Sequence, residues 1–339
     1  MDLNFIRLRS EQNEHQFLAP YAAFADQSAG RTVNVPEDPI RTCFQRDRDR
    51  ILHSKCFRRL KHKTQVFLAP KGDHFRTRLT HTLEVAQISR TVSRALRLNE
   101  DLTEAIALGH DVGHPPFGHA GEAALDQALQ VHFEKTGEGP GSFRHYEQSY
   151  RLLVEVEKLN LSAEVLNGIH GHSKGEKDLT ADDGIAKSSL ESAVVRICDR
   201  IAYLNHDLDD AIRSGFIDSV PSQFAHLGGT HGHRINAMVT SLIAASEGLP
   251  EIRLPDEMLA TLNELKDWLF QNVYYRYPIE LPEINKAKNV VIELFDQYVQ
   301  PGNLPEGFSG VWGAIDYVSG MSDTFAIRTF EELRVPRGF

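Results

Sequence analysis

The strongest constraint on the fold of this chain is a long helical pattern of apolar residues near its middle. The stripe has successive spacings of 4, 3, 4, 3, 4 and 4 residues, and it comprises Leu190, Val194, Ile197, Ile201, Leu204, Leu208 and Ile212. These spacings follow the period of about 3.6 residues of an α-helix with one apolar face. The sequence therefore predicts an amphipathic helix over 188–213, which needs other apolar elements to cover its stripe.

Helical patterns also account for most of the remaining chain. Apolar positions at the same spacing predict helices over 83–98 and near 146–159, 256–275, 284–299 and 312–332. Strand signals are weak, with at most a short hairpin near 67–75. The sequence therefore predicts an all-α fold, an irregular bundle of helices.

Composition and charge exclude several classes of protein. Of the 339 residues, 41% are hydrophobic and 25% are charged, which is ordinary for a globular chain. No apolar run reaches the roughly 18 residues of a transmembrane helix. The net charge of −10 disfavours a surface devoted to nucleic acid or anionic lipid. Three cysteines without CxxC spacing fit a reducing compartment, so we expect a cytoplasmic protein with no membrane partner.

Residues 41–63 form a basic island in this acidic chain. They carry nine Lys or Arg side chains against two acids, Asp47 and Asp49. A basic island of this kind suggests a confined polyanion site, such as one for a nucleoside triphosphate, but charge alone does not select it over plainer alternatives. The alternatives are a solvated helix face with internal ion pairs, or a subunit contact. We expect residues 58–59 and 61–65 to border the polyanion site, and we assign Arg46, Arg48 and Arg50 to a second anion site or a subunit contact.

A predicted helix break lies near residue 115. Asp101, with Glu104 three residues later, predicts a capped helix start, and this helix runs towards His110-Asp111. Pro115-Pro116 end it, and a new helix is expected near Gly118. A break of this kind frees backbone N–H groups and lets polar side chains converge.

Histidines gather around this break. Twelve of the chain's 16 histidines lie between residues 53 and 206, and His110, His114 and His119 fall within ten residues of one another, together with Asp111. A lone His-Asp pair is usually ordinary surface. Three imidazoles and a carboxylate around one break favour a charged functional site.

The 188–213 helix offers further polar candidates. Asp199, Tyr203 and Asp207 are spaced i, i+4 and i+8, so they share one face apart from the apolar stripe. Taken alone, this face could be a solvated edge. Imidazole and carboxylate are also the ligands that divalent Mn, Fe, Co, Ni and Zn accept. A set of His81, His110, Asp111 and Asp199 would leave positions open for water and a phosphate oxygen, although spacing alone does not select His81 from the other histidines.

The order of these four residues resembles that of the HD-domain metal-dependent phosphohydrolases. Five segments look like the bacterial deoxyguanosinetriphosphate triphosphohydrolase-like family, in the same order: 41–67, 76–90, 109–125 (GHDVGHPPFGHAGEAAL), 143–153 and 197–212 (ICDRIAYLNHDLDDAI). Segments 18–31 and 316–326 are similar to that family as well. The resemblance therefore covers nearly the whole chain.

The resemblance implies a role for each candidate residue. The metal ligands would be His81, His110, Asp111 and Asp199. His119 and Glu122 would activate or position the attacking water, His114 would face the phosphates, and His145 would lie near the scissile phosphate. Arg78 and Arg200 would contact phosphates, Tyr203 and Asp207 would contact the deoxyribose, and Gln65 would contact the 3′-hydroxyl. Four other histidines, His53, His62, His170 and His172, are expected to be structural or on the surface.

The resemblance also implies an activity and an organisation. It implies hydrolysis of a deoxynucleoside triphosphate (dGTP or several dNTPs) to deoxynucleoside and inorganic triphosphate, with a divalent Mn, Mg, Fe, Co or Ni ion. It implies a homo-oligomer and admits a regulatory dNTP or single-stranded nucleic acid as a further partner. The expected parts are an N-terminal extension (1–45), an HD catalytic core (46–215) and a C-terminal helical region (216–339) packed on the core.

Two alternative functions stay open at this point. One is an HD-domain nucleotidase that releases orthophosphate. The other is a regulatory HD protein that binds nucleic acid through the basic island.

Overall fold

The structure is a computed structural model that describes residues 4–66, 76–173, 177–180, 182, 189–276 and 282–336. Its longer helices are α1 (Asn4–Phe17), α2 (Cys43–Leu52), α4 (Arg78–Ala95), α5 (Glu100–Gly109), α6 (Gly118–Thr136), α9 (Leu190–Arg213), α10 (His231–Ser246), α11 (Asp256–Leu269), α13 (Pro282–Tyr298), α14 (Gly310–Ser319) and α15 (Asp323–Arg334). Shorter helices are α3 (Lys55–Arg59), α7 (His145–Arg151) and α8 (Ala163–His170), with 3₁₀ turns at Ala25–Gln27, Leu60–His62 and Ser222–Leu227.

The all-α prediction is confirmed. Over the described ranges, extended pairing is limited to two isolated bridges, Arg31 with Ser162 and Thr64 with Thr77. The hairpin expected near 67–75 lies outside the described residues. The predicted helix over 188–213 is α9, and its apolar stripe is buried from Leu190 to Leu208.

Other predicted helices differ from the structure in their ends. The helices expected near 146–159 and 256–275 each finish in a π-helical turn, at Leu152–Val156 and Phe270–Tyr274. The single helix expected over 312–332 is wrong, because α14 ends at Ser319 and α15 begins at Asp323. The Ser322 hydroxyl accepts a hydrogen bond from Phe325 N and so caps a new helix.

The predicted cap of α5 is also wrong by two residues. Asn99, not Asp101, is the N-cap, and its side chain accepts a hydrogen bond from Leu102 N. Asp101 lies in the first turn, where its carboxylate contacts Arg48 at 2.7 Å and Gln45 at 2.9 Å. Asn and Asp are about equally good N-cap residues, so residue type alone does not select Asp101 over Asn99. Asp101 pairs with Arg48 and Gln45 instead of capping the helix.

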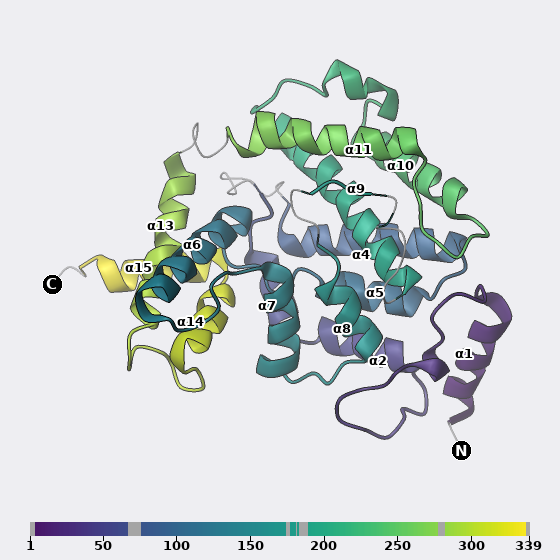
Figure 1. Cartoon of the computed structure of the whole chain (residues 1–339), viewed down its shortest axis with the longest axis horizontal. Helices are drawn as coiled ribbons and strands as arrows, with labels where there is room; N and C mark the ends of the chain where they lie inside the picture. The colour runs from purple at the N-terminus through teal and green to yellow at the C-terminus, as the bar shows by residue number, and fades with distance from the viewer. Residues whose placement is uncertain are drawn as a thin grey trace.

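Two apolar clusters hold the described helices together. The larger is built around α9, which packs against α4, α5, α10 and α11 (Figure 1). The smaller joins α6 to α13, α14 and α15 and forms the lobe at the left of Figure 1. The larger cluster takes residues from all three expected parts of the chain, from Ala22 to Ile284, and the division at 45 and 215 stays a prediction.

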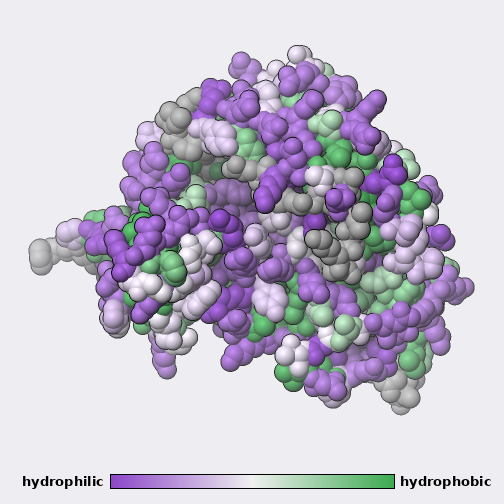
Figure 2. All heavy atoms as spheres, viewed as in Figure 1, coloured by the Kyte–Doolittle hydropathy of each residue, from purple (hydrophilic) through white to green (hydrophobic). Residues whose placement is uncertain are grey.

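The surface is mostly hydrophilic on the face shown in Figure 2, where apolar side chains form small separate groups. Among the described helices, none combines the length and the apolar character needed to cross a membrane.

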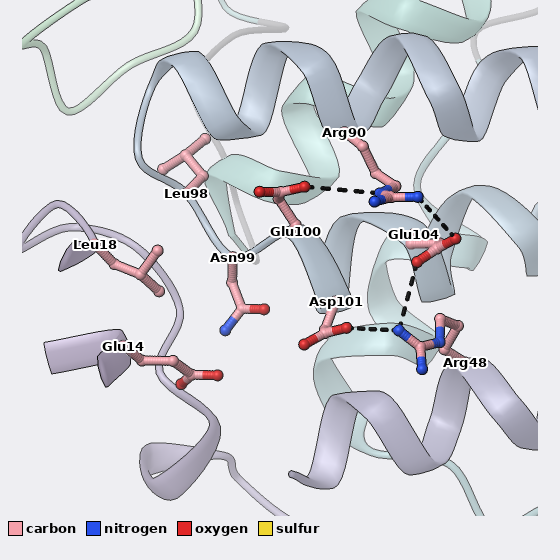
Figure 3. A pocket seen from close by; sticks show the side chains of 9 residues that line it. All are labelled: Glu14, Leu18, Arg48, Arg90, Leu98, Asn99, Glu100, Asp101 and Glu104. Carbon is pink, nitrogen blue, oxygen red and sulfur yellow. Dashed lines mark hydrogen bonds and ion pairs between the residues drawn. The ribbon is translucent and has the colours of Figure 1, made fainter. Parts of the chain in front are cut away.

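The arginines of the basic island bond within the chain. Arg48 Nη1 lies 2.7 Å from Asp101 Oδ1 and 3.6 Å from Glu104 Oε2, in a cavity of about 320 Å³ between α1, α2 and α5 (Figure 3). Arg41 pairs with Asp38 and Asp49, Arg46 donates to Pro36 O, and Arg50 donates to Asn160 O. Internal ion pairs, one of the alternatives considered for this run, thus account for Arg41 and Arg48, while the assignment of Arg46, Arg48 and Arg50 to a second anion site or a subunit contact stays a prediction.

Glu14 points into the same cavity and gives a pH-dependent contribution to stability (Figure 3). Burial raises the pKa of Glu14 from its ordinary value of 4.5 to about 7, although Ala25 N donates to its carboxylate at 2.7 Å. Because the folded pKa lies above the unfolded one, the stability that protonated Glu14 contributes is complete below pH 4.5 and is lost as the pH rises to about 7.

We therefore expect Glu14→Gln to become more stable relative to the wild type as the pH rises. Between pH 4.5 and pH 8 the gain should be about 1–2 kcal/mol, after allowance for the partial exposure of the group. Urea unfolding of both proteins at the two pH values measures it, with the exposed Glu138→Gln as the matched control. A stability difference that does not change with pH would contradict the effect.

Candidate metal centre

The centre is built at the break between α5 and α6. α5 ends at Gly109, and His110 and Asp111 follow directly. The chain then turns back with Phe117 and Gly118 both in the left-handed region, at φ of 66° and 60°. A Cβ atom on Gly118 would lie 2.4 Å from Gln65 O, and one on Gly113 would lie 2.2 Å from Ser149 N. The close approach of these backbones therefore requires glycine at both positions.

Four predicted ligands converge from three helical segments. His81 comes from α4, His110 and Asp111 follow α5, and Asp199 comes from α9. His81 Nε2 lies 3.1 Å from Asp199 Oδ1 and 3.8 Å from Asp111 Oδ2. His110 Nε2 lies 3.6 Å from Asp199 Oδ1 and 3.4 Å from Asp111 Oδ1. Atoms held about 2.1 Å from one ion lie roughly 3–4 Å from one another, so His81, His110 and Asp199 lie close enough to share one divalent ion, and Asp111 adjoins both histidines.

The imidazole of His110 is oriented for metal binding. Its Nδ1 donates a hydrogen bond to Ala107 O at 2.6 Å, which leaves the lone pair on Nε2. Nε2 is buried and has no hydrogen-bond partner. A buried acceptor without a partner is costly unless something else satisfies it, and a metal ion would do so.

Electrostatics keep both carboxylates ionised. Burial opposes the charge on Asp111, but the neighbouring His110, His114 and Arg78 hold its pKa well below the usual range. Burial also opposes the charge on Asp199, whose pKa is nevertheless lowered by His81 and His110. Ionised carboxylates are the form that binds a metal.

Arg78, expected at the phosphates, contacts the predicted metal ligand Asp111. It is 1% exposed, and its Nη1 donates to Asp111 Oδ2 at 2.6 Å. Its Nη2 donates to Gln65 O at 3.3 Å, while Nε has no partner. Arg78 thus fixes the carboxylate and keeps a positive charge beside the ligand cluster.

A second group of imidazoles adjoins the cluster and is organised by Glu122. Glu122 Oε1 accepts hydrogen bonds from His145 Nδ1 at 2.8 Å and from His145 N at 2.9 Å. The rings of His114 and His145 are stacked, with centroids 3.9 Å apart. His114 Nε2 lies 3.5 Å from Asp111 Oδ1, which links this group to the metal ligands.

His119 is less firmly held than His145. Its Nδ1 lies 3.5 Å from Glu122 Oε2, and its side chain is 61% exposed. Of the two candidates for acid–base chemistry, the structure therefore buries and orients His145 and leaves His119 at the rim.

The residues expected at the sugar form two contacts. The guanidinium of Arg200 lies over the ring of Tyr203, 5.4 Å from its centroid. The hydroxyl of Tyr274 donates to Asp207 Oδ2, while Asp207 Oδ1 is buried without a partner. Burial raises the pKa of Asp207 to about 6. The buried Gln65 Oε1 also lacks a partner, and no contact joins Gln65 to these residues among the described interactions.

Sequence reasoning missed His172 and Tyr274. His172 was expected to be structural or on the surface, but it is buried, and its ring centroid lies 4.9 Å from that of His110. Its Nδ1 donates to Ile169 O at 2.6 Å, which leaves the lone pair on Nε2, and Nε2 lies 3.3 Å from His145 Nε2. Together with His110 and Asp111 it forms a further group that could hold an ion. Its burial excludes the surface alternative for His172 and leaves the structural one, which stays a prediction.

Comparison with known proteins is consistent with this centre. Residues 78–204 match the HD domain family, and residues 252–332 match the phosphohydrolase-associated domain. A "deoxyguanosinetriphosphate triphosphohydrolase-like protein" of Caldanaerobacter subterraneus subsp. tengcongensis is 46% identical over 98% of this chain and 96% of its own length. A protein of the same description from Desulfatibacillum aliphaticivorans is 45% identical, over 98% of each chain.

The chain belongs to the deoxyguanosinetriphosphate triphosphohydrolase-like family. A further member, from Clostridium tetani, is 40% identical over 99% of this chain and 98% of its own. Among solved structures, a hypothetical protein from Aquifex aeolicus is similar with a TM-score of 0.49 and 18% identity, covering 84% of this chain and 67% of that one. The family and its HD domain make this chain a phosphohydrolase, and HD domains bind divalent metals.

Removing one carboxylate ligand tests the centre. Asp199→Ala should lose bound divalent metal while its helical circular dichroism stays at the wild-type level, because the side chain faces the ligand cluster and not the apolar stripe. Metal content by inductively coupled plasma mass spectrometry measures it. Asp209→Ala, the same change on the same helix but directed to Arg76 and Arg213, should keep the metal. Equal metal content in the Asp199 variant and the wild type would contradict the assignment.

Proposed function

We propose that this protein hydrolyses a deoxynucleoside triphosphate to deoxynucleoside and inorganic triphosphate, using a divalent metal ion. The observation that carries the proposal is the buried His145–Glu122 pair beside a two-His, two-Asp ligand cluster. The substrate class is supported by the relatives, which are described as deoxyguanosinetriphosphate triphosphohydrolase-like.

The ligands His81, His110, Asp111 and Asp199 would hold the ion, for which Mn, Mg, Fe, Co and Ni are candidates. When bound, such an ion supplies Lewis acidity and lowers the pKa of water. Arg78 and Arg200 would add positive charge for the phosphates, and His114 would face them. Burial and nearby Arg78 hold the pKa of His114 well below its usual value, so it is a neutral hydrogen-bonding group.

His145 is the proposed acid–base group. Its Nδ1–H donates to Glu122, so Nε2, which lies 3.3 Å from His172 Nε2, is the nitrogen that would exchange a proton with substrate or water. Burial opposes protonation, but Glu122 raises the pKa of His145 overall. In the proposed reaction water attacks the α-phosphorus, the P–O bond to the 5′-oxygen breaks, and His145 passes a proton to that oxygen. His119 would hold water at the rim.

The deoxyribose would lie against Tyr203 and Asp207. Asp207 has one oxygen engaged by Tyr274 and one without a partner, so it can accept a hydrogen bond from a sugar hydroxyl. A packed aromatic ring under the sugar would exclude a 2′-hydroxyl by steric clash, which gives selectivity for deoxynucleotides.

Product analysis tests this function directly. Incubation with dGTP and Mn²⁺ should release deoxyguanosine and tripolyphosphate, and GTP should be a far poorer substrate because of its 2′-hydroxyl. Phosphorus NMR and chromatography of the nucleoside identify the products, with the Asp199→Ala protein as the blank. Release of orthophosphate would instead indicate a nucleotidase, and cleavage of GTP as fast as dGTP would contradict the sugar pocket.

Comparing two histidines tests the acid–base assignment. His145→Ala should lower kcat by about 10²–10⁴-fold, the range for loss of a positioned general acid–base group. His119→Ala should lower kcat much less, because its side chain is 61% exposed and its contact with Glu122 is longer. Steady-state kinetics with dGTP at fixed Mn²⁺ measures both. If the His119 variant has the larger defect, the two roles are reversed.

A further inference from the structure

His81, the metal ligand on α4, has a second nitrogen that contacts another buried histidine. Its Nε2 faces the carboxylates of the cluster, and its Nδ1 lies 3.2 Å from Nδ1 of His206 on α9. His206 is 0% exposed. The opposite nitrogen of His206, Nε2, is in contact with the carboxylate of Glu84, which lies one turn after His81 on α4. The three side chains thus form a line that starts at the ligand cluster and ends at Glu84.

The donors and acceptors along this line match in only one way for a metal ligand. His206 Nε2 meets a carboxylate, which only accepts, so Nε2 must carry the proton. A neutral His206 then has its lone pair on Nδ1, which accepts the proton of His81 Nδ1–H. His81 in turn has its lone pair on Nε2, on the side of Asp111 and Asp199. Each imidazole is therefore in the tautomer that metal binding at His81 requires.

The line also has a structural basis in the packing of the two helices. α4 and α9 lie against each other, and each contributes one ligand and one supporting residue. His206 follows Asp199 by seven residues, two helical turns along the same face, and Glu84 follows His81 by three. His110 is oriented differently, through the backbone carbonyl of Ala107.

We propose that His206 and Glu84 are positioning residues that fix the tautomer of His81 and strengthen it as a metal ligand. The proposal rests on the proposed metal site, and it adds two residues that do not touch the ion. In other metal sites, loss of the group that orients a ligating histidine weakens metal binding by about 10–100-fold.

The Mn²⁺ affinity of the whole chain tests this arrangement of Glu84, His206 and His81, which we call the relay. Mn²⁺ dissociation constants would be measured by competition with a chelator for the wild type, His206→Leu and His206→Asn. The side-chain oxygen of Asn can replace Nδ1 as the acceptor for His81, whereas Leu cannot accept. We expect the Leu variant to bind Mn²⁺ about 10–100-fold more weakly, and the Asn variant to stay within about threefold of the wild type.

The controls separate positioning from a general structural role. His132→Leu, the same kind of change at a histidine of α6 that packs on Phe295 with ring centroids 5.9 Å apart, should leave the Mn²⁺ affinity unchanged. Thermal melting of the metal-free proteins reports on their stability. If His206 had only a structural role, the Leu and Asn variants would both be less stable, but their Mn²⁺ affinities would not differ from each other. If the Leu variant does not fold, the Mn²⁺ affinities of Glu84→Ala and Glu84→Gln are compared instead. Only Gln can still accept a hydrogen bond from His206, so the Ala variant should bind Mn²⁺ more weakly.

The outcomes discriminate the relay from the metal site itself. Wild-type affinity in the Leu variant, or equal losses in Leu and Asn, would overturn the relay and leave the site in place. Equal Mn²⁺ affinities of Glu84→Ala and Glu84→Gln would contradict a role for Glu84 in the relay. A wild-type protein that fails to bind Mn²⁺ would overturn the metal site and the proposed function together with the relay.

Discussion

The buried carboxylate of Asp111 is the constraint on which the rest of the site depends. An ionised group that is 4% exposed is tolerated only when partners and hydrogen bonds compensate for its lost hydration. Arg78 lies 2.6 Å from it, His110 at 3.4 Å and His114 at 3.5 Å, so α4 and the turn after α5 meet at this carboxylate. Asp199 repeats the pattern on the other side of the cluster, where His81 is its nearest partner.

The C-terminal helices take part in shaping the centre. Asp323, at the start of α15, accepts hydrogen bonds from Phe117 N and Thr64 N, both at 2.9 Å. The fully buried Lys63 donates to the carbonyls of His114 and Ser319, which ties the break after α5 to the end of α14. Burial lowers the pKa of Lys63 to about 7. The phosphohydrolase-associated domain thus holds the same backbone turn that presents His110 and Asp111.

The sequence predicts what depends on local period and on residue type. The apolar stripe of α9 and the four candidate ligands could be found this way, with family resemblance selecting His81. What it could not predict depends on neighbours that are distant in sequence. Glu122 follows His119 by three residues, and this local spacing predicts a His119–Glu122 pair. The Glu122 carboxylate instead accepts its hydrogen bond from His145 on another helix. His172, His206 and Tyr274 carried no local signal, because their roles come only from the packing of α8, α9 and the turn after α11.

Charge balance links metal binding to substrate binding in this centre. Without an ion, Asp111, Asp199 and Glu122 place three negative charges in a small buried volume, against which Arg78 supplies one fixed positive charge. A triphosphate carries close to four negative charges, so such a pocket would repel it. A divalent ion held by the two aspartates would bring the sum of these charges to zero, so the pocket would no longer repel phosphate oxygens. Two arginines of the basic island, Arg41 and Arg48, are already paired with Asp38, Asp49 and Asp101 and so add little free positive charge. In a chain of net charge −10, the proposed triphosphate site would therefore depend on the bound ion for much of its positive charge.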